Sequence, residues 1–340
     1  MRKLLCLALA AALACALPAA ASARSLTLAV VTKPGSAQNV AAGQLASLLE
    51  AFSGGDFQVE ILDSGRAGDE SQILEKIRKG SLDMAVVTAG PFDAYNVLLG
   101  VIGHPFLFSD YAQADAVLQG ALGDEILADL EGAGFVGLAF SENGFRNLTN
   151  NKRPVKSPGD LSGLRIRVME SPLQQDLWQA LGATPVPLPW PIDKALADGA
   201  VDGQENPLWV VDEYGLYRVQ KYMTLTRHVY SPHVVVAGKK LWERLSDRER
   251  GLVTRAAREA AAYQRGENRA QETKHLEDSL GHGMQVEEKP DIAAFRQKAA
   301  ALEKLPYYQQ ARVHSLLSRI RSLIAVDSRA GGSEASQKEK

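Results

Sequence analysis

The amino-acid sequence predicts an α/β fold with a parallel, doubly wound sheet and enough chain for two domains. Apolar, β-branched runs alternate with segments of helical periodicity over residues 26–88, in the order strand, helix, strand, helix, strand. This rhythm is typical of parallel strands joined by crossover helices. The 340 residues allow two domains with a cleft between them. The segment 246–283 predicts one helix that exceeds the size of a small domain and could span both.

The first half of the chain supplies most of the strands of the predicted sheet. The first helical segment ends at Gly54 and Gly55, because glycine readily adopts the conformation that stops a helix. The predicted elements are, in chain order, a strand at 26–32, a helix at 39–55, a strand at 57–63, a helix at 69–81, a strand at 82–88, a helix at 111–134 and a strand at 135–141.

The second half of the chain is predicted to hold shorter strands and more helix. One helix begins with Ser171 as its N-cap, followed by proline, and the long helix begins with Ser246 and Glu249 in the pattern of a capping box. The polar, Gly- and Ser-rich segment 327–340 is predicted to be disordered. The other elements are short strands at 146–150 and 164–168, a helix at 171–183, a turn, short helix, short strand and turn over 189–207, a strand at 233–238, and helices at 293–305 and 309–326.

Residues 1–23 have the pattern of a secretory signal peptide. A basic start precedes an apolar run, and a small-x-small cleavage site ends at Ala23. Both cysteines of the chain, Cys6 and Cys15, lie in this segment, so the exported chain has no thiol for a disulfide, a metal or catalysis. The residues before Cys15 match a lipoprotein cleavage box only faintly, which favours a soluble product.

Charge and motifs exclude several classes of function. The formal net charge is −2, and cleavage of the signal peptide removes two basic residues and leaves −4, which gives no electrostatic case for nucleic acid or an anionic membrane. No nucleophile elbow, phosphate-binding loop or dinucleotide glycine pattern is present, and the histidines lack metal-ligand spacing. We therefore expect no metal and no cofactor.

Asp69 and Glu70 could act as an acid–base pair, but capping of the following helix is the favoured interpretation.

The strongest candidates for binding chemistry are arginines. In the segment GLRIRV, residues 163–168, Arg165 and Arg167 alternate with apolar residues and so share one face of a predicted strand. Arg146 follows the sequence ENGF. A guanidinium group binds a carboxylate through two parallel hydrogen bonds and stays charged at neutral pH. The alternative for these arginines is a solvated sheet edge or a surface ion pair.

Two further patterns leave their roles open. In VDGQENP, residues 201–207, Asn206 offers amide donors just before a proline fixes the chain, or it belongs to an ordinary polar turn. Aromatic side chains could line a pocket, although each one alone is more typical of a core. The aromatic candidates are Phe92, Phe106, Phe108, Trp190 and Trp209.

Several stretches occur together in an order that resembles one family. They are GSLDMAVV (80–87), NGFRNLTN (143–150), RPVKSPGDLSGLRIRV (153–168), ALGATPVPLPW (180–190), AVDGQENP (200–207) and VQKYMTLTRHVYSPHVVV (219–236). The chain resembles the extracytoplasmic solute-binding subunit of tripartite ATP-independent periplasmic (TRAP) transporters, of the dicarboxylate-binding-protein type. The resemblance extends from about Leu26 to about Ala325, and the arginine of IRV and the VDGQENP turn are its most specific parts.

The resemblance implies an α/β, two-lobed periplasmic-binding-protein clamshell with a long hinge-bracing helix. It implies a lobe I of residues 24–143 plus about 232–270, and a lobe II of residues 144–231 plus about 271–326. Closure on the ligand is then a hinge motion, because both lobes must meet the ligand.

The resemblance also implies which residues bind a ligand carboxylate. In that family the arginine of the IRV strand forms a bidentate salt bridge with the carboxylate, and Arg167 occupies its position. Arg146 matches the family's second arginine, and Asn206 matches its amide donor to the same carboxylate. Arg165 stands where the family often has lysine and is not expected to contact the ligand.

Three other side chains are implied to contact the rest of the ligand. Glu70 matches an acidic residue near ligand hydroxyls, and Trp190 matches an aromatic residue that packs against the ligand body. The loop over 86–92 offers Thr88, and it lacks the glutamate that some sialic-acid binders carry there. The stretch PWPIDKALADG is one residue shorter than the family pattern and lacks its glutamate, which removes one polar contact from the implied site.

The sequence therefore predicts a periplasmic solute-binding protein, not an enzyme, that captures an organic acid and delivers it to the membrane subunits of a TRAP transporter. The expected ligand is a sugar acid or a C4-dicarboxylate, and the expected oligomeric state is a monomer. Two alternatives stay open. One is a module that presents its ligand to a sensor, and the other is an exported enzyme that uses Glu70 or Asp69 as a base on a carboxylated substrate.

Overall fold

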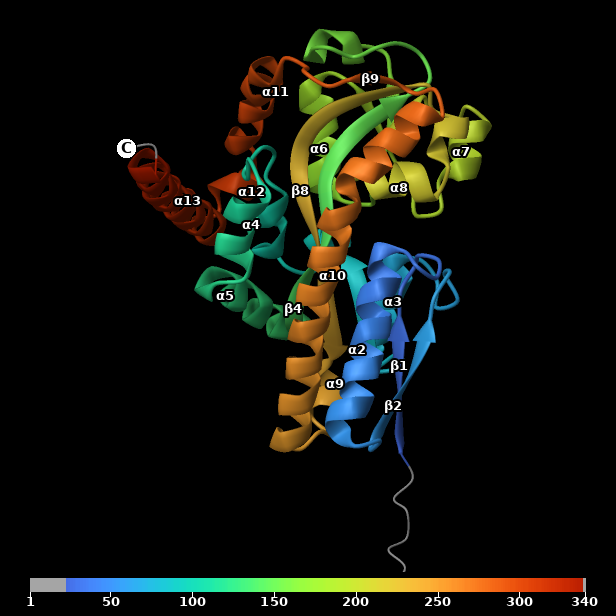
Figure 1. Ribbon diagram of the computed structural model, residues 1–340, viewed down its shortest axis with the longest axis vertical. Coiled ribbons are helices and arrows are strands. Elements are labelled where there is room, and N and C mark those ends of the chain that lie inside the picture. Colours follow the sequence, from blue (N-terminus) through green and yellow to red (C-terminus); the bar gives the residue numbers. More distant parts are fainter. Residues whose placement is uncertain (1–22, 339–340) are drawn as a thin grey trace, which may run out of the picture.

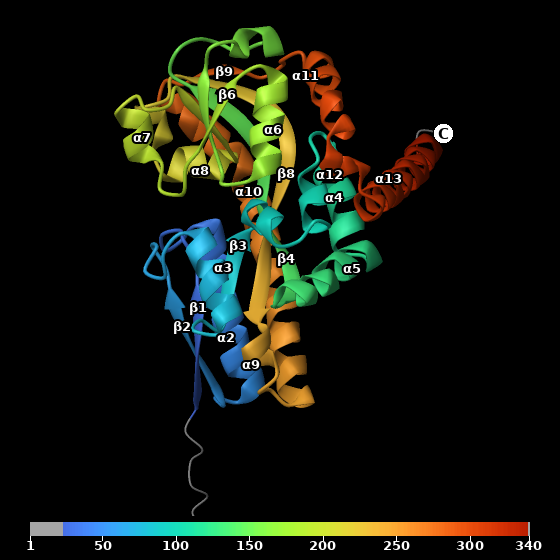
Figure 2. The same ribbon diagram turned by 180° about the vertical axis from the view of Figure 1, so that it is seen from behind.

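The computed structural model describes the backbone of residues 23–338 and the side chains of residues 23–326. The predicted signal peptide lies outside the described residues except for Ala23, and so do both cysteines. Two lobes lie one above the other, and two long strands and one long helix run through both (Figures 1 and 2). Within residues 23–338, none of the helices combines the length and apolar composition of a membrane span.

The strands of the described residues form one mixed sheet. Its order is β2-β1-β3-β8-β4-β7-β5-β6, with β9 paired to β8. The bounds are β1 (Arg24–Ala29), β2 (Phe57–Leu62), β3 (Met84–Thr88), β4 (Phe135–Asn150), β5 (Arg165–Val168), β6 (Thr184–Pro187), β7 (Gly203–Asn206), β8 (Tyr222–Gly238) and β9 (Gln285–Glu287).

The parallel sheet predicted from residues 26–88 is confirmed for β1, β2 and β3, whereas the complete sheet is mixed. β1 pairs parallel with β2 and β3, as the strand–helix–strand rhythm predicts. β8 pairs antiparallel with both β3 and β4, and β4 pairs antiparallel with β7. The alternation of strands and helices predicts only how strands that are consecutive in the sequence are connected. β8 comes much later in the chain and enters the first lobe from the second, so it runs antiparallel to β3.

The two strands that connect the lobes, β4 and β8, are longer than the sequence predicts. Predicted strands at 135–141 and 146–150 merge into β4, and the predicted strand at 233–238 is the end of β8. The register of the pair shifts between Glu142 and Gly144, where glycine adopts φ +118°. Such a bulge bends a strand, which lets β4 pass from one lobe to the other.

The helices cover both faces of the sheet and part of its side. Their bounds are α2 (Ala37–Ser53), α3 (Glu70–Lys79), α4 (Tyr111–Leu118), α5 (Ala121–Asp129), α6 (Pro172–Leu181), α7 (Asp193–Ala197), α8 (Leu208–Glu213), α9 (Lys239–Trp242), α10 (Asp247–Gly281), α11 (Ile292–Ala299), α12 (Pro306–Gln309) and α13 (Ala311–Lys338). Short 3₁₀ helices are η1 (Gly90–Ala94), η2 (Leu99–Gly103), η3 (Leu130–Ala133), η4 (Pro158–Leu161), η5 (Leu216–Arg218) and η6 (Ala300–Lys304).

Two helix predictions differ from the structure. The predicted helix over 111–134 is divided into α4, α5 and η3, with Gly120 as the N-cap of α5. The predicted disordered tail is instead helical as far as Lys338, as a continuation of α13. Its alanine, glutamate, glutamine and lysine residues have high helix propensity, which offsets the two glycines.

The long helix α10 is the element that braces the two lobes. It begins at the predicted capping box, in which the Ser246 side chain accepts from the Glu249 N–H and the Glu249 carboxylate accepts from the Ser246 N–H. Along its length it packs on α2 in the first lobe, on β4, and on α8 in the second lobe (Figure 1). Its buried small residues, including Ala256, Ala257 and Ala260, allow this close contact with the sheet.

Candidate ligand-binding site

A cavity with about 400 Å³ of empty space, including its part open to solvent, lies between the two lobes. The first lobe contributes Val31 and Thr32, which follow β1, the start of α2, the start of α3 and the end of β3. The second lobe contributes β5, β7 and α8. The passing strands β4 and β8 form its floor. All of the sequence-predicted site residues line this one cavity; they are Glu70, Thr88, Arg146, Arg167, Trp190 and Asn206.

Arg167 on β5 brings a buried positive charge to the cavity. Its side chain is 3% exposed. Its Nε and Nη2 donate to the main-chain oxygen of Leu188, at 2.8 and 2.5 Å, and no ion pair among the described residues includes it. Burial lowers the pKa of Arg167 to about 10, so the guanidinium stays charged at neutral pH. A buried cation is costly unless an anion accompanies it, which makes this side chain a binding group for an anion.

Arg165, two residues earlier on the same strand, has a different environment. It is exposed and forms an ion pair with Asp202 at 2.9 Å between Nη2 and Oδ1, outside the cavity. The alternating pattern predicts that both arginines share a face, but Arg165 is exposed and Arg167 is buried at the cavity. The expectation that Arg165 does not contact the ligand agrees with this placement.

Arg146 on β4 is also buried, but its charge is already neutralised. Its Nη2 donates to Glu205 Oε1 at 2.8 Å, and its Nε donates to the other oxygen of that carboxylate. The same Nη2 lies 3.0 Å from Asn206 Oδ1. The sequence reasoning assigned Arg146 to the ligand and overlooked Glu205, although Glu205 lies inside the VDGQENP motif. Arg146 therefore orients Asn206 at the cavity, and its direct contact with a ligand stays a prediction.

Glu205 is the buried carboxylate that compensates Arg146. Burial alone would raise its pKa, but the charge of Arg146 and hydrogen bonds from His228 and Arg146 outweigh burial and lower the pKa to about 2. His228 Nε2 lies 3.1 Å from Glu205 Oε2. Arg146, Glu205 and His228 thus contact one another, whereas Arg167 has no carboxylate in direct contact among the described residues.

The opposite wall of the cavity carries a carboxylate, that of Glu70. Its Oε1 accepts three hydrogen bonds, from Gln38 Nε2 at 2.8 Å, from the Thr88 N–H at 2.8 Å and from Thr88 Oγ1 at 2.9 Å. Its Oε2 has no hydrogen-bond partner among the described residues. The neighbouring Asp69 caps α3 by accepting from the Gln72 N–H, as the favoured interpretation predicts. Thr88 thus positions Glu70, and Gln38 is a site residue that the sequence reasoning missed.

Two of the candidate aromatic residues reach the cavity. Trp190 packs edge-on against Tyr214, with ring centroids 4.7 Å apart, and Trp209 donates from Nε1 to the main-chain oxygen of Asn143 at 2.8 Å. The other three candidates, Phe92, Phe106 and Phe108, are buried in the hydrophobic core instead. The tryptophans offer the flat apolar surface that packs against the carbon skeleton of a ligand.

The floor of the cavity carries two polar residues that the sequence reasoning did not select. Asn143 on β4 and His233 on β8 are 4% and 1% exposed. Asn143 Oδ1 and His233 Nδ1 are buried without a hydrogen-bond partner. Burial, together with the charge of Arg146, lowers the pKa of His233 to about 3, so its ring is neutral at pH 7. The available signal for Asn143 was the polar triplet Ser141-Glu142-Asn143, which directly follows the apolar run 135–140.

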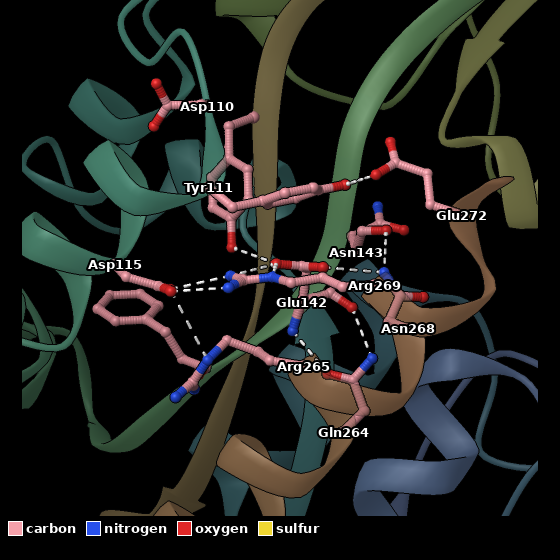
Figure 3. A network of polar contacts seen from close by, with 12 residues as sticks. Asp110, Tyr111, Asp115, Glu142, Asn143, Gln264, Arg265, Asn268, Arg269 and Glu272 are labelled. Carbon is pink, nitrogen blue, oxygen red and sulfur yellow. Dashed lines mark hydrogen bonds and ion pairs between the residues drawn. The ribbon is translucent and has the colours of Figure 1, made fainter. Parts of the chain in front are cut away.

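Behind this floor, a polar network joins β4 to α10 (Figure 3). The buried Glu142 carboxylate accepts from Arg269 Nε at 2.8 Å, from Asn268 Nδ2 at 3.1 Å and from the Tyr230 hydroxyl at 3.2 Å. The Gln264 amide pairs with the main-chain N–H and oxygen of Glu142, at 2.7 and 2.8 Å. These contacts fix the bulge of β4 on the helix and thereby fix the adjacent Asn143.

The chain matches a known protein family. The sequence profile described as "Bacterial extracellular solute-binding protein, family 7" matches residues 28–310. The chain belongs to this family. Its members are solute-binding components of transport, and the resemblance to TRAP solute-binding proteins and the two-lobed fold are confirmed.

Individual relatives of this solute-binding protein carry names that describe their ligands. The 2,3-diketo-L-gulonate-binding periplasmic protein YiaO of Escherichia coli is 34% identical over 72% of this chain and 75% of its own length. The C4-dicarboxylate-binding periplasmic protein DctP of Rhodobacter capsulatus is 29% identical over 79% of this chain and 81% of its own length. A TRAP periplasmic solute-binding protein of Bradyrhizobium, solved with D-galacturonate, is 31% identical with a TM-score of 0.85, over 88% of this chain and all of its own.

Proposed function

We propose that this solute-binding protein captures a hydroxylated monocarboxylic acid of the sugar-acid class in the periplasm and, as a monomer, delivers it to the membrane subunits of a TRAP transporter. The observation that carries the proposal is the buried Arg167 guanidinium, which lines the cavity without an acidic partner. A ligand carboxylate supplies that partner through charge-assisted hydrogen bonds.

The opposite wall favours hydroxyl groups over a second carboxylate. Glu70 keeps one carboxylate oxygen without a partner at the cavity, while three donors hold its other oxygen. A carboxylate accepts hydrogen bonds from hydroxyl groups, whereas a second anionic group beside it is repelled. A sugar acid therefore matches both walls, whereas a C4-dicarboxylate matches only the wall of Arg167. Two of the relatives described above are named for sugar-acid ligands, which supports the choice.

Contacts across the mouth of the cavity support capture by enclosure. The main-chain N–H of Lys33, which follows β1 in the first lobe, donates to the Tyr214 hydroxyl at the end of α8 at 3.0 Å. The Lys33 Nζ donates to the main-chain oxygen of Glu213 at 2.5 Å and lies 4.7 Å from the centre of the Tyr214 ring. Tyr214 in turn packs on Trp190, so the contact between the lobes is joined directly to the cavity wall.

A thermal-shift screen of the exported chain, residues 24–340, tests the proposal. The acids are gluconate, galacturonate, glucuronate, succinate and malate, with neutral sugars as negative controls. An acid at a hundred times its dissociation constant adds about 2.7 kcal/mol to the free energy of unfolding. We expect a sugar acid to shift the wild type and Arg165→Ala but not Arg167→Ala. An equal shift in Arg167→Ala, a shift by the dicarboxylates alone, or conversion of the acid seen by mass spectrometry would refute the proposal.

A further inference from the structure

The floor of the cavity contains the polar atoms that neither wall explains. Gln38, Glu70 and Thr88 hydrogen-bond to one another, and Arg146 is paired with Glu205. Asn143 and His233, in contrast, each bury one polar atom without a partner although their side chains line the cavity. Buried polar groups are nearly always hydrogen-bonded in folded proteins, so two orphaned atoms at one cavity indicate a missing partner.

We propose that Asn143 and His233 form a subsite for a hydroxyl group on the carbon next to the ligand carboxylate, and that this subsite selects 2-hydroxy acids over their 2-deoxy counterparts. The inference rests on the proposed function, because it takes Arg167 as the group that binds the carboxylate.

The chemistry of the two side chains identifies a hydroxyl group. A neutral imidazole has one nitrogen that donates and one that accepts, and a primary amide has an oxygen that accepts and a nitrogen that donates. A hydroxyl group both donates and accepts, so it can donate to the unpaired Asn143 Oδ1, and it can pair with His233 Nδ1 in either tautomer of the imidazole. A second carboxylate only accepts, and a methylene group does neither, so both would leave a buried polar atom unpaired.

The position of the subsite places it beside the carboxylate end of the cavity. Asn143, His233, Arg146 and Arg167 line the same cavity, and Asn143 and Arg146 lie three residues apart on β4. The charge of Arg146 acts on both His233 and Arg167, in agreement with this placement. His233 pairs with Ser141 in the register of β4 and β8, two residues before Asn143, so both residues belong to the same part of the floor. The ligand atom nearest to both the carboxylate and this floor is the substituent on the adjacent carbon.

Asn143 is fixed before a ligand arrives. Its main-chain oxygen accepts from Trp209 Nε1 at 2.8 Å, and its side-chain nitrogen donates to Ser231 Oγ at 3.4 Å. The adjacent Glu142 is held to α10 by the network in Figure 3. A rigidly positioned group rejects an analogue that lacks its partner more strongly than a mobile group does, because it cannot turn to find another.

Calorimetric titration with matched acids tests the inference. The probes are D-gluconate against 2-deoxy-D-gluconate, and D-erythronate against 3,4-dihydroxybutanoate, which lacks only the hydroxyl next to the carboxylate. For at least one pair, we expect the wild type to bind the hydroxylated acid on the order of tenfold to a hundredfold more tightly. Asn143→Leu and His233→Leu reduce that ratio toward one, mainly by weakening the hydroxylated acid, and His233→Gln retains part of it.

His104→Leu is the matched control, because His104 is also buried and has a lowered pKa but does not line the cavity. It should leave the ratio unchanged. A wild type that prefers neither hydroxylated acid, or an unchanged ratio in both leucine variants, overturns the inference. If a leucine variant does not fold, the inference is tested by the affinity ratio of the wild type and by the affinity ratio of His233→Gln. Failure of the proposed function is recognised separately, since Arg167→Ala would then still bind the acids.

Discussion

The two walls of the cavity present their charged groups in opposite ways. On the second lobe, the buried Arg167 donates to a main-chain oxygen and has no carboxylate partner among the described residues. On the first lobe, three donors from α2 and β3 hold one oxygen of Glu70 in place. The difference separates two tasks: a cation without a carboxylate in direct contact supplies affinity for an anion, and an anchored carboxylate supplies a fixed acceptor for neutral groups.

The same contrast is repeated within the second lobe, between Arg167 and Arg146. Both guanidinium groups are buried, but only Arg146 has a carboxylate, Glu205, in direct contact. One arginine therefore serves the structure and the other is available for the ligand. Single substitutions can alter each of these differences separately.

Removal of Arg146 is expected to have the largest effect on stability. Arg146→Ala leaves the buried Glu205 carboxylate with His228 as its remaining direct partner among the described side chains, and loss of one partner of a buried ion pair costs about 3–5 kcal/mol. Urea unfolding measures the change. Arg258→Ala, which breaks a pair with Asp124 that is exposed on both sides, should cost less than about 1 kcal/mol. Similar losses in the two variants would contradict the assignment of Arg146 to the structure.

A second effect concerns pH and a contact between the lobes near the hinge. Asp93 on η1 accepts a hydrogen bond from Ser171 at the start of α6. Burial raises the pKa of Asp93 from 3.8 to about 7, so the folded protein binds this proton more tightly than the unfolded chain does. The contribution to stability is therefore complete below about pH 4 and declines as pH rises to about 7, by at most about 4 kcal/mol.

Asp93→Asn tests this pH dependence, because asparagine cannot ionise. The variant should lose the decline in melting temperature between about pH 4 and pH 7 and melt above the wild type at pH 8. Glu303→Gln provides a comparison, since an ion pair with Arg321 lowers rather than raises the pKa of Glu303. A wild-type slope that persists in Asp93→Asn would show that another group is responsible.

The sequence predicted those features whose causes are local. The alternation of Arg165 and Arg167 with apolar residues located β5, and Ser246 with Glu249 located the start of α10. The family resemblance then selected six residues that do line one cavity.

The features that could not be predicted depend on side chains that are distant in the sequence and close in the fold. Glu142 is a buried carboxylate in β4, and it is accommodated because Arg269, 127 residues later, pairs with its side chain. Glu205 lies 59 residues from Arg146, so no local pattern shows that the two are paired. The exposed Arg165 and the buried Arg167 look alike in sequence, although Arg165 pairs with Asp202 outside the cavity and Arg167 lines it.

The charge of Glu70 is expected to control the type of acid. Glu70→Gln keeps an oxygen that accepts from Gln38 and Thr88 but removes the negative charge from the first wall. Affinity for gluconate should fall about tenfold, and the preference for gluconate over succinate should fall further, since a second carboxylate is no longer repelled. Calorimetric titration measures both. Glu75→Gln, on the same helix but outside the cavity, should change neither value.

The smallest expected effect tests whether the walls are held together from outside the cavity. Tyr214→Phe keeps the ring that packs on Trp190 but removes the hydroxyl that accepts from the Lys33 N–H. One hydrogen bond between the lobes contributes about 1 kcal/mol, so the acid should dissociate about fivefold faster with its association rate nearly unchanged. Stopped-flow measurement of dissociation detects this. Tyr217→Phe is the control, because the Tyr217 ring stacks on His282 instead of joining the lobes at the cavity. An unchanged dissociation rate in Tyr214→Phe would mean that the ligand, through Arg167 and Glu70, holds the walls together without this contact.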